Sequence, residues 1–228
     1  MNARPPLPPP RAVLFDLDGT LLDTAPDLTT ALNRLRQECG AAALPLQDVR
    51  HHVSHGADAV VRAGFPGSAG DEFAALKSRF LELYRAGICI ESRLFPGFES
   101  TLQAMETAGI PWGIVTNKAG WLTDPLLQAV ALAHRAGCVV AGDSMPERKP
   151  HPRPLLVAAA LLHVAPEHCI FVGDAERDIV AARAAGMLAL GVHFGYLGVH
   201  DTPDTWQADG WLTAPGELLR WLGLPASA

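Results

Sequence analysis

The sequence predicts an α/β protein built on a doubly wound parallel sheet, with a small all-helical cap subdomain inserted into it. Three observations carry this prediction. A short apolar run at residues 12–15 ends on an acidic residue, which is typical of a buried strand. The pattern between residues 24 and 92 is helical throughout. From residue 95 onward, strand-like runs alternate with helical stretches, and such alternation produces right-handed crossovers between parallel strands.

The helical insertion begins where the pattern changes after Pro26. Leucine and alanine residues recur there at helical spacing, and Gly40 is a stop signal. Further helical segments are expected at about residues 46–53, 56–64 and 72–86. An all-helical insertion directly after the first strand is unusual for an α/β chain, so we expect it to form a separate subdomain.

The chain returns to alternation at the Phe-Pro-Gly sequence of residues 95–97. Helices are expected at residues 98–108, 121–133, 154–163 and 176–185, and strands at residues 112–116, 138–141, 169–172 and 188–192. The expected division is therefore an α/β core of residues 11–23 and 93–228 and a helical cap of residues 24–92. Residues 1–10 are rich in proline and are expected to form an extended, mobile arm.

Composition limits the possible partners and compartments. The 228 residues suit one large domain or a core with a small insertion, and 49% hydrophobic against 18% charged residues excludes disorder for the bulk of the chain. A net charge of −6 without a basic run disfavours nucleic acid and anionic membranes as partners. Because no secretory signal is visible and the four cysteines are scattered, we expect a reduced, cytoplasmic protein. The sequence does not distinguish a monomer from a homodimer.

The first strand ends on two acidic residues, Asp16 and Asp18. Positions i and i+2 of an extended chain point to the same side, so the two carboxylates converge at the carboxyl end of the strand. Close carboxylates repel each other unless a cation neutralises them or one stays protonated. Asp18 with Gly19 could serve simply as a turn, but a turn does not explain Asp16. The pair therefore indicates metal-assisted chemistry.

The ends of the later strands carry polar side chains of a related kind: Thr116, Asn117 and Lys118, then Asp143 and Lys149, then Asp174 and Asp178. In a parallel sheet, ligands bind beyond the carboxyl ends of the strands. Carboxylates for a divalent cation, with a hydroxyl and an ammonium for anionic oxygens, suit phosphoryl chemistry. Simpler interpretations stay open: a solvated charge for Lys149, an ordinary strand residue for Thr116, a turn for Asp143, and a favourable helix N-terminus for Asp174 and Asp178.

Four motifs in this order resemble those of the phosphatase branch of the haloacid dehalogenase superfamily. They are DLDGT at residues 16–20, Thr116, Lys149-Pro150, and Gly173-Asp174 with Asp178. The helical insertion resembles the small cap of that superfamily's first cap class. The resemblance covers roughly residues 11–220 and implies Mg²⁺-dependent hydrolysis of a small phosphorylated metabolite through an aspartyl-phosphate intermediate.

The resemblance also implies a role for each motif residue. Asp16 would be the nucleophile, and Asp18 would donate a proton to the leaving oxygen and then activate water. The Mg²⁺ ligands would be Asp16, the main-chain carbonyl of Asp18, and Asp174. The phosphate would be bound by Thr116, the amide of Asn117 and Lys149, and Asp178 would orient Lys149 or a metal-bound water.

These motifs imply the reaction but do not determine which phosphate ester is the substrate. Residues 53–58 fall where phosphoglycolate phosphatases have their cap loop, and the chain resembles that family. Residues 94–97, 112–118 and 194–209 resemble instead the N-acetylmuramic acid 6-phosphate phosphatases. We hypothesise that Ser54, His55 and Arg62 shape the substrate choice, because a cap loop closes over the leaving group.

Other functions on the same scaffold are weighed against this interpretation. A mutase would share Asp16 and Asp18 but protect the aspartyl-phosphate from water. A dehalogenase needs neither an acid at position 18 nor a metal, and a non-catalytic binding module would show a damaged motif. His51, His52 and His55 resemble metal ligands, but they lie in the helical insertion, and an oxygen-rich site prefers Mg²⁺ to zinc.

Overall fold

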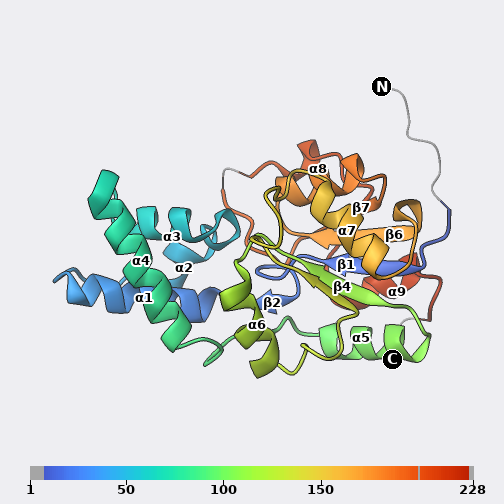
Figure 1. The fold of residues 1–228 in the computed structure, drawn as a ribbon, viewed down its shortest axis with the longest axis horizontal. Coiled ribbons are helices and arrows are strands. Elements are labelled where there is room, and N and C mark those ends of the chain that lie inside the picture. Colours follow the sequence, from blue (N-terminus) through green and yellow to red (C-terminus); the bar gives the residue numbers. More distant parts are fainter. Residues whose placement is uncertain (1–7, 200, 226–228) are drawn as a thin grey trace.

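The computed structural model describes residues 8–199 and 201–225. It consists of a parallel sheet between layers of helices, with a group of helices, α1 to α4, lying beside the sheet (Figure 1). The predicted α/β class with an inserted helical cap is confirmed. Most of the proline-rich arm, residues 1–7, lies outside the described residues. The helices that are described include none long and apolar enough to cross a membrane.

Six strands of the described chain form the main sheet, in the order β5-β4-β1-β6-β7-β8, and every neighbouring pair is parallel. Their bounds are Cys138–Val140, Trp112–Val115, Ala12–Phe15, Cys169–Gly173, Leu188–Val192 and Gly210–Leu212, in that spatial order. The central strand β1 aligns Phe15 with Ile114 of β4 and with Val172 of β6. The residues that follow these strands therefore leave the sheet at the same edge.

Both faces of the sheet are covered. Alternate residues of β1 belong to different hydrophobic clusters, Val13 and Phe15 to one and Ala12 and Leu14 to the other, as the two-residue period of a strand requires. Helices α5 (Phe98–Thr107), α6 (Gly120–Ala129) and α9 (Leu218–Trp221) contribute to the first cluster, and α7 (Arg153–Leu161) and α8 (Glu176–Ala184) to the second. This two-sided burial explains why β1 is apolar throughout.

The cap contains α1 (Ala25–Glu38), α2 (Leu46–Arg50), α3 (Ala57–Gly64) and α4 (Gly70–Ala86). Leu28, Leu32 and Leu35 of α1 are buried, as their helical spacing predicts. The helix expected over residues 46–53 is wrong at its end: α2 ends at Arg50, and a short 3₁₀ turn, Val53–His55, leads to Gly56. This turn places the cap loop over the edge of the sheet.

Short strands were missed by the sequence analysis. The cap leaves and rejoins the core through an antiparallel pair, β2 (Leu22–Asp23) and β3 (Arg93–Leu94). Strand β8 was also missed, because the sequence pattern predicts no strand after residues 188–192. Segments of two or three residues are too short to show a period, so only pairing with a neighbour defines them.

The connection between cap and core is stabilised by Tyr196, which lies in the loop after β7. Its hydroxyl accepts hydrogen bonds from the backbone N–H groups of Thr24, at 2.6 Å, and Ala25, at 2.9 Å, and donates one to Asp23, at 2.8 Å. The first N–H groups of a helix have no partner within the helix. Tyr196 thus caps α1, and Arg50, which pairs with Asp23 at 3.0 Å, stacks over the Tyr196 ring.

Replacing Tyr196 with phenylalanine tests this connection. The ring would still fill its site, but two backbone N–H groups would lose their acceptor, so the free energy of unfolding should fall by about 1–3 kcal/mol. Urea unfolding would measure the change. Tyr84→Phe is the matched control, because within the described residues the buried Tyr84 hydroxyl accepts no hydrogen bond from a backbone N–H, so its loss should cost less. Equal losses in both variants would contradict the capping role.

Candidate active site

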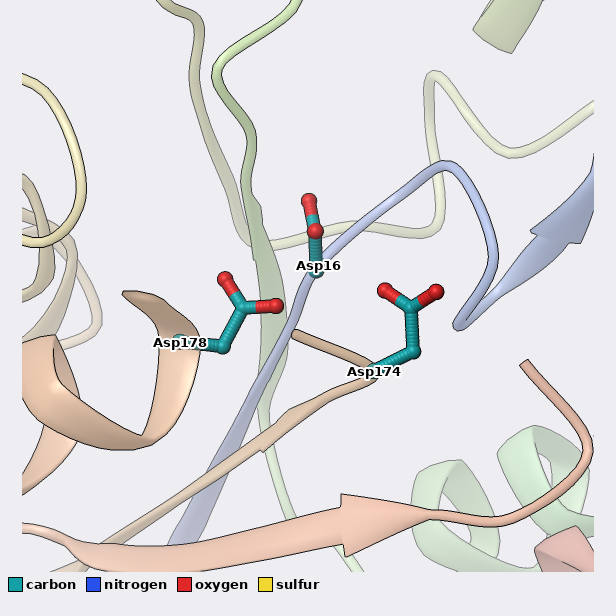
Figure 2. A group of neighbouring side chains, drawn as sticks. All are labelled: Asp16, Asp174 and Asp178. Atoms are coloured by element: carbon teal, nitrogen blue, oxygen red, sulfur yellow. The ribbon is translucent and has the colours of Figure 1, made fainter. Parts of the chain in front are cut away.

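The carboxyl ends of the central strands bring acidic side chains together beneath the cap. Asp16 follows β1, Asp174 follows β6, and Asp178 lies in the first turn of α8. Figure 2 shows their three carboxylates converging from these elements, and a carboxylate oxygen of each lies within 4.8 Å of the others. All three side chains are buried. Such a group has the oxygen ligands and negative charge that suit a divalent cation.

Asp16 is held as a charged carboxylate. Lys149 Nζ lies 2.8 Å from its Oδ1, the backbone N–H of Leu17 donates to the same oxygen at 2.7 Å, and Arg177 Nη2 lies 3.8 Å from Oδ2. Burial alone would raise the pKa of Asp16, but the charges of Lys149 and Arg177 outweigh burial and hold that pKa below its usual value. An ionised oxygen at this position is suited to nucleophilic attack.

Lys149 is shared between two carboxylates. Its ammonium also lies 2.9 Å from Asp178 Oδ1, and neither side chain is exposed to solvent. The backbone N–H of Ala175 donates to Asp178 Oδ2 at 3.1 Å. The Asn117 side chain exchanges two hydrogen bonds with the main chain of Lys149, at 3.0 and 3.1 Å. The lysine is therefore fixed at both its main chain and its ammonium.

Asp174 lies in an unfavourable electrostatic environment for a charged carboxylate. Burial, and then the charges of Asp16 and Asp178, raise its pKa to about 7. Its Oδ2 accepts hydrogen bonds from the Ser54 hydroxyl, at 2.6 Å, and from the backbone N–H of Tyr196, at 3.0 Å. A carboxylate that is buried beside two others needs a proton or a cation, and so the donor set fits a metal ion.

Gly19 makes the turn after β1 possible. Its φ of 83° lies in the left-handed region, and a Cβ atom there would collide with the Asp174 carboxylate. The glycine thus lets the β1 loop pass directly over Asp174. This close approach is the structural reason for glycine in the first motif.

Asp18 forms hydrogen bonds with residues other than Asp16, Asp174 and Asp178. Its Oδ1 accepts hydrogen bonds from the Thr24 hydroxyl, at 2.6 Å, and from Lys118 Nζ, at 2.8 Å. Thr116 is buried nearby at the end of β4, and its Oγ1 accepts a hydrogen bond from the backbone N–H of Lys118 at 3.1 Å. The Thr116 hydroxyl proton therefore remains available for another acceptor.

A cavity of about 530 Å³ lies between the strand ends and the cap. The strand ends and the loops after them contribute charged and polar residues to its lining: Asp16, Asp18, Thr116, Asn117, Lys118, Arg148 and Arg177. Apolar and aromatic residues come from the cap and from α6 of the core: Leu28, Val53, Val60, Leu81 and Tyr84, and Trp121 and Leu122. Lys77 and Asp58, 2.6 Å apart, also reach the cavity from the cap. The lining therefore combines a charged region at the strand ends with an apolar region that the cap and α6 share.

The structure brings only some of the expected cap residues to this cavity. Ser54 and His55 line it. Arg62 does not: its guanidinium stacks on the Phe73 ring, 4.2 Å from the ring centre, within the cap. The tilted rings of His51 and His52 pack against each other with their centres 4.1 Å apart, and neither residue lines the cavity.

Other residues at the site were missed by sequence reasoning. Arg177 lies between Asp174 and Asp178 in the fourth motif, and this position in the sequence could have identified it as a site residue. Trp121, whose exposed fraction is 48%, follows the second motif and had no signal of its own. Asp143 accepts a hydrogen bond from the backbone N–H of Gly120 at 2.8 Å, which agrees with a turn residue outside the site.

The fold and the site together define a hydrolase whose active site lies between a doubly wound parallel sheet and a helical cap. The chain belongs to the haloacid dehalogenase-like hydrolase family, whose model matches residues 13–192. A phosphoglycolate phosphatase of Xanthomonas campestris pv. campestris is 44% identical over 209 residues, which are 92% of this chain and 95% of that protein. An N-acetylmuramic acid 6-phosphate phosphatase of Pseudomonas aeruginosa is 40% identical over 210 residues, 92% of this chain and 93% of that protein.

A solved structure agrees with these relatives. The crystal structure described as a predicted phosphoglycolate phosphatase from Haemophilus somnus superposes with a TM-score of 0.83 and 29% identity, covering 92% of this chain and 97% of that one. The family and its phosphatase relatives show that this chain is a phosphatase enzyme with a phosphorylated small-molecule substrate.

The charge crowding at Asp174 predicts how stability depends on pH when divalent cations are chelated. Between about pH 4 and pH 7 the folded state keeps a proton on Asp174 that the unfolded state has lost. The unfolded state then binds fewer protons, so the free energy of unfolding should fall as pH rises through this range, by roughly 1–4 kcal/mol.

Urea unfolding of the chelated protein at several pH values would measure this slope. Asp174→Asn should make the slope smaller, whereas Asp204→Asn, which removes an exposed carboxylate, should keep the wild-type slope. A slope that is the same in Asp174→Asn and the wild type would show that Asp174 does not carry the effect.

Proposed function

We propose that this phosphatase hydrolyses phosphomonoesters of small metabolites with Asp16 as the nucleophile, Asp18 as the proton carrier and Mg²⁺ as the cofactor. The observation that carries the proposal is the buried Asp16 carboxylate, kept ionised by Lys149 beside Asp174 and Asp178. The first candidate substrate is 2-phosphoglycolate, because the relative from Xanthomonas campestris, 44% identical to this chain, is a phosphoglycolate phosphatase.

The first half of the reaction uses the anchored carboxylate. An Asp16 oxygen attacks phosphorus, the P–O bond to the leaving group breaks, and the leaving oxygen takes a proton from Asp18. In the second half, water attacks phosphorus, Asp18 takes the proton of that water, and the bond between Asp16 and phosphorus breaks. Inorganic phosphate leaves, and the Asp16 carboxylate and the Asp18 proton are both restored.

The surrounding cations and donors match the charge that develops on the phosphoryl oxygens. Lys149 and Arg177 each lie close to one carboxylate oxygen of Asp16. Within the described residues, the Thr116 hydroxyl donates no hydrogen bond and can donate one to a phosphoryl oxygen. Asp178 orients Lys149. Mg²⁺ bound by Asp16, Asp174 and the Asp18 carbonyl would neutralise repulsion between the nucleophile and the phosphate dianion.

The size of the cavity favours a second candidate, a larger sugar phosphate such as N-acetylmuramic acid 6-phosphate. A cavity of about 530 Å³ falls in the range of sites for drug-sized ligands and exceeds what a two-carbon acid fills. The exposed face of Trp121 offers an apolar surface of the kind on which sugar rings pack. Ser54 and His55, which line the cap side, are proposed to contribute to the choice between the candidates.

Replacing Asp16 with asparagine tests the nucleophile. The amide is nearly isosteric, so the fold should remain while Mg²⁺-dependent phosphate release falls by at least about 10⁴-fold. A chelator should stop the wild-type reaction reversibly. Steady-state assays would measure the effects of Asp16→Asn and of the chelator, with Asp204→Asn, at an exposed carboxylate, as the control variant. Hydrolysis that persists in Asp16→Asn would refute Asp16 as the nucleophile.

A phosphate-release screen over phosphomonoesters with Mg²⁺ would identify the substrate, provided it includes 2-phosphoglycolate and N-acetylmuramic acid 6-phosphate. Because His55 lines the cavity, His55→Ala should change the ratio of kcat/KM for the two. Arg62 stacks on Phe73 outside the cavity, so Arg62→Ala should leave that ratio unchanged. An unchanged ratio in His55→Ala would remove His55 from the specificity residues. Release of free phosphate also separates a phosphatase from a mutase.

A further inference from the structure

We propose that Lys118 is a positioning residue, which holds Asp18 in the orientation needed for proton transfer when Tyr84 of the cap lies against it. This inference rests on the proposed function, because it assigns Lys118 to the proton carrier of that reaction. It is a role distinct from that of Lys149, which contacts Asp16 and Asp178.

The hydrogen bonds to Asp18 distinguish its two oxygens. Within the described residues, both side-chain donors, Thr24 Oγ1 at 2.6 Å and Lys118 Nζ at 2.8 Å, lie on Oδ1. A carboxylate fixed through one oxygen has its rotamer set and keeps the other oxygen for a reacting proton. Asp18 also lines the cavity, where the leaving oxygen would lie. Anchoring Oδ1 therefore presents Oδ2 as the oxygen that exchanges the proton.

Lys118 itself is confined. The exposed fraction of its side chain is 8%, and its only salt bridge within the described residues is to Asp18. The Asp18 carboxylate lies 2.8 Å from the Lys118 ammonium and is its charged partner in this buried position. A buried ammonium loses its hydration, which makes its bond to Asp18 stronger and its position better defined than those of an exposed pair.

The cap supplies the remaining wall of this site. The Lys118 ammonium lies 4.7 Å from the centre of the Tyr84 ring, which belongs to α4 and is 1% exposed. A cation over an aromatic face is attracted to the ring, and the ring also excludes water from the ion pair. Lys118 is thus fixed between Asp18 of the core and Tyr84 of the cap. The orientation of Asp18 depends on cap and core being in contact.

A purely structural role for Lys118 would lower the activity toward all substrates equally. A role in positioning the proton donor predicts a dependence on the leaving group. An alkoxide leaving group needs the proton, whereas p-nitrophenolate leaves readily without one, so loss of positioning should affect alkyl esters far more. Comparison of kcat/KM for 2-glycerol phosphate and p-nitrophenyl phosphate therefore separates the two roles.

For the full-length protein, Lys118→Met should lower kcat/KM for the alkyl ester by about 10- to 100-fold and that for the aryl ester by less than about threefold. Tyr84→Leu, which removes the ring, should show the same bias more weakly, and Tyr84→Phe, which keeps the ring, should show less bias than Tyr84→Leu. These cap variants keep the test available if Lys118→Met does not fold. Adding Lys118→Met to Asp18→Asn should cause no further loss with the alkyl ester.

The Asp18→Asn variant separates failure of this inference from failure of the proposed function. If Asp18→Asn lowers kcat/KM equally for the alkyl ester and the aryl ester, Asp18 is not the proton carrier, and the proposed function is wrong in that step. If Asp18→Asn shows the bias but Lys118→Met and Tyr84→Leu do not, the inference about Lys118 is overturned. An additive loss in the double variant would overturn it as well.

Discussion

The structure depends on one interaction, the placement of the Lys149 ammonium between Asp16 and Asp178. All three side chains are buried, and a buried charge is tolerated only when it is closely paired. The pairing keeps Asp16 ionised in a place where burial alone would protonate it. Removing Lys149 would therefore leave Asp16 and Asp178 as two uncompensated buried carboxylates, so stability and chemistry depend on the same contact.

The fold supports this interaction from several separate segments. Asn117, after β4, fixes the main chain of Lys149, while the first turn of α8 supplies Asp178 and an N–H that binds it. The parallel register of β1, β4 and β6 brings these segments to one edge of the sheet. A site assembled from adjacent strand ends needs no long loop to position it, which explains how residues distant in the sequence meet within hydrogen-bond distance.

This dependence on strand ends also explains what could be predicted from the sequence. The α/β class, the inserted helices and the residues after each strand follow from local patterns, and parallel strands necessarily align their ends. The partners of Asp18 could not be predicted, because Lys118 is 100 residues away in the chain and an ion pair leaves no periodic signal. The contact between Arg62 and Phe73 could not be predicted for a related reason: helical spacing does not indicate whether a cation faces the cavity or a neighbouring ring. Strand β8 is defined by pairing with β7 and not by its three residues.

The two acidic residues of the first motif are held by different parts of the molecule. Asp16 is held by Lys149 from within the core, whereas Asp18 is held by Lys118, which the cap covers through Tyr84. Under the proposed mechanism, changes in α4 would therefore alter the leaving-group side of the cavity and leave the contact between Asp16 and Lys149 intact. The same changes would still act on proton transfer, because the orientation of Asp18 is linked to the cap. In the proposed reaction, substrate choice and protonation of the leaving group are thus coupled through one cap helix, α4, whereas the ion pair that holds Asp16 lies within the core.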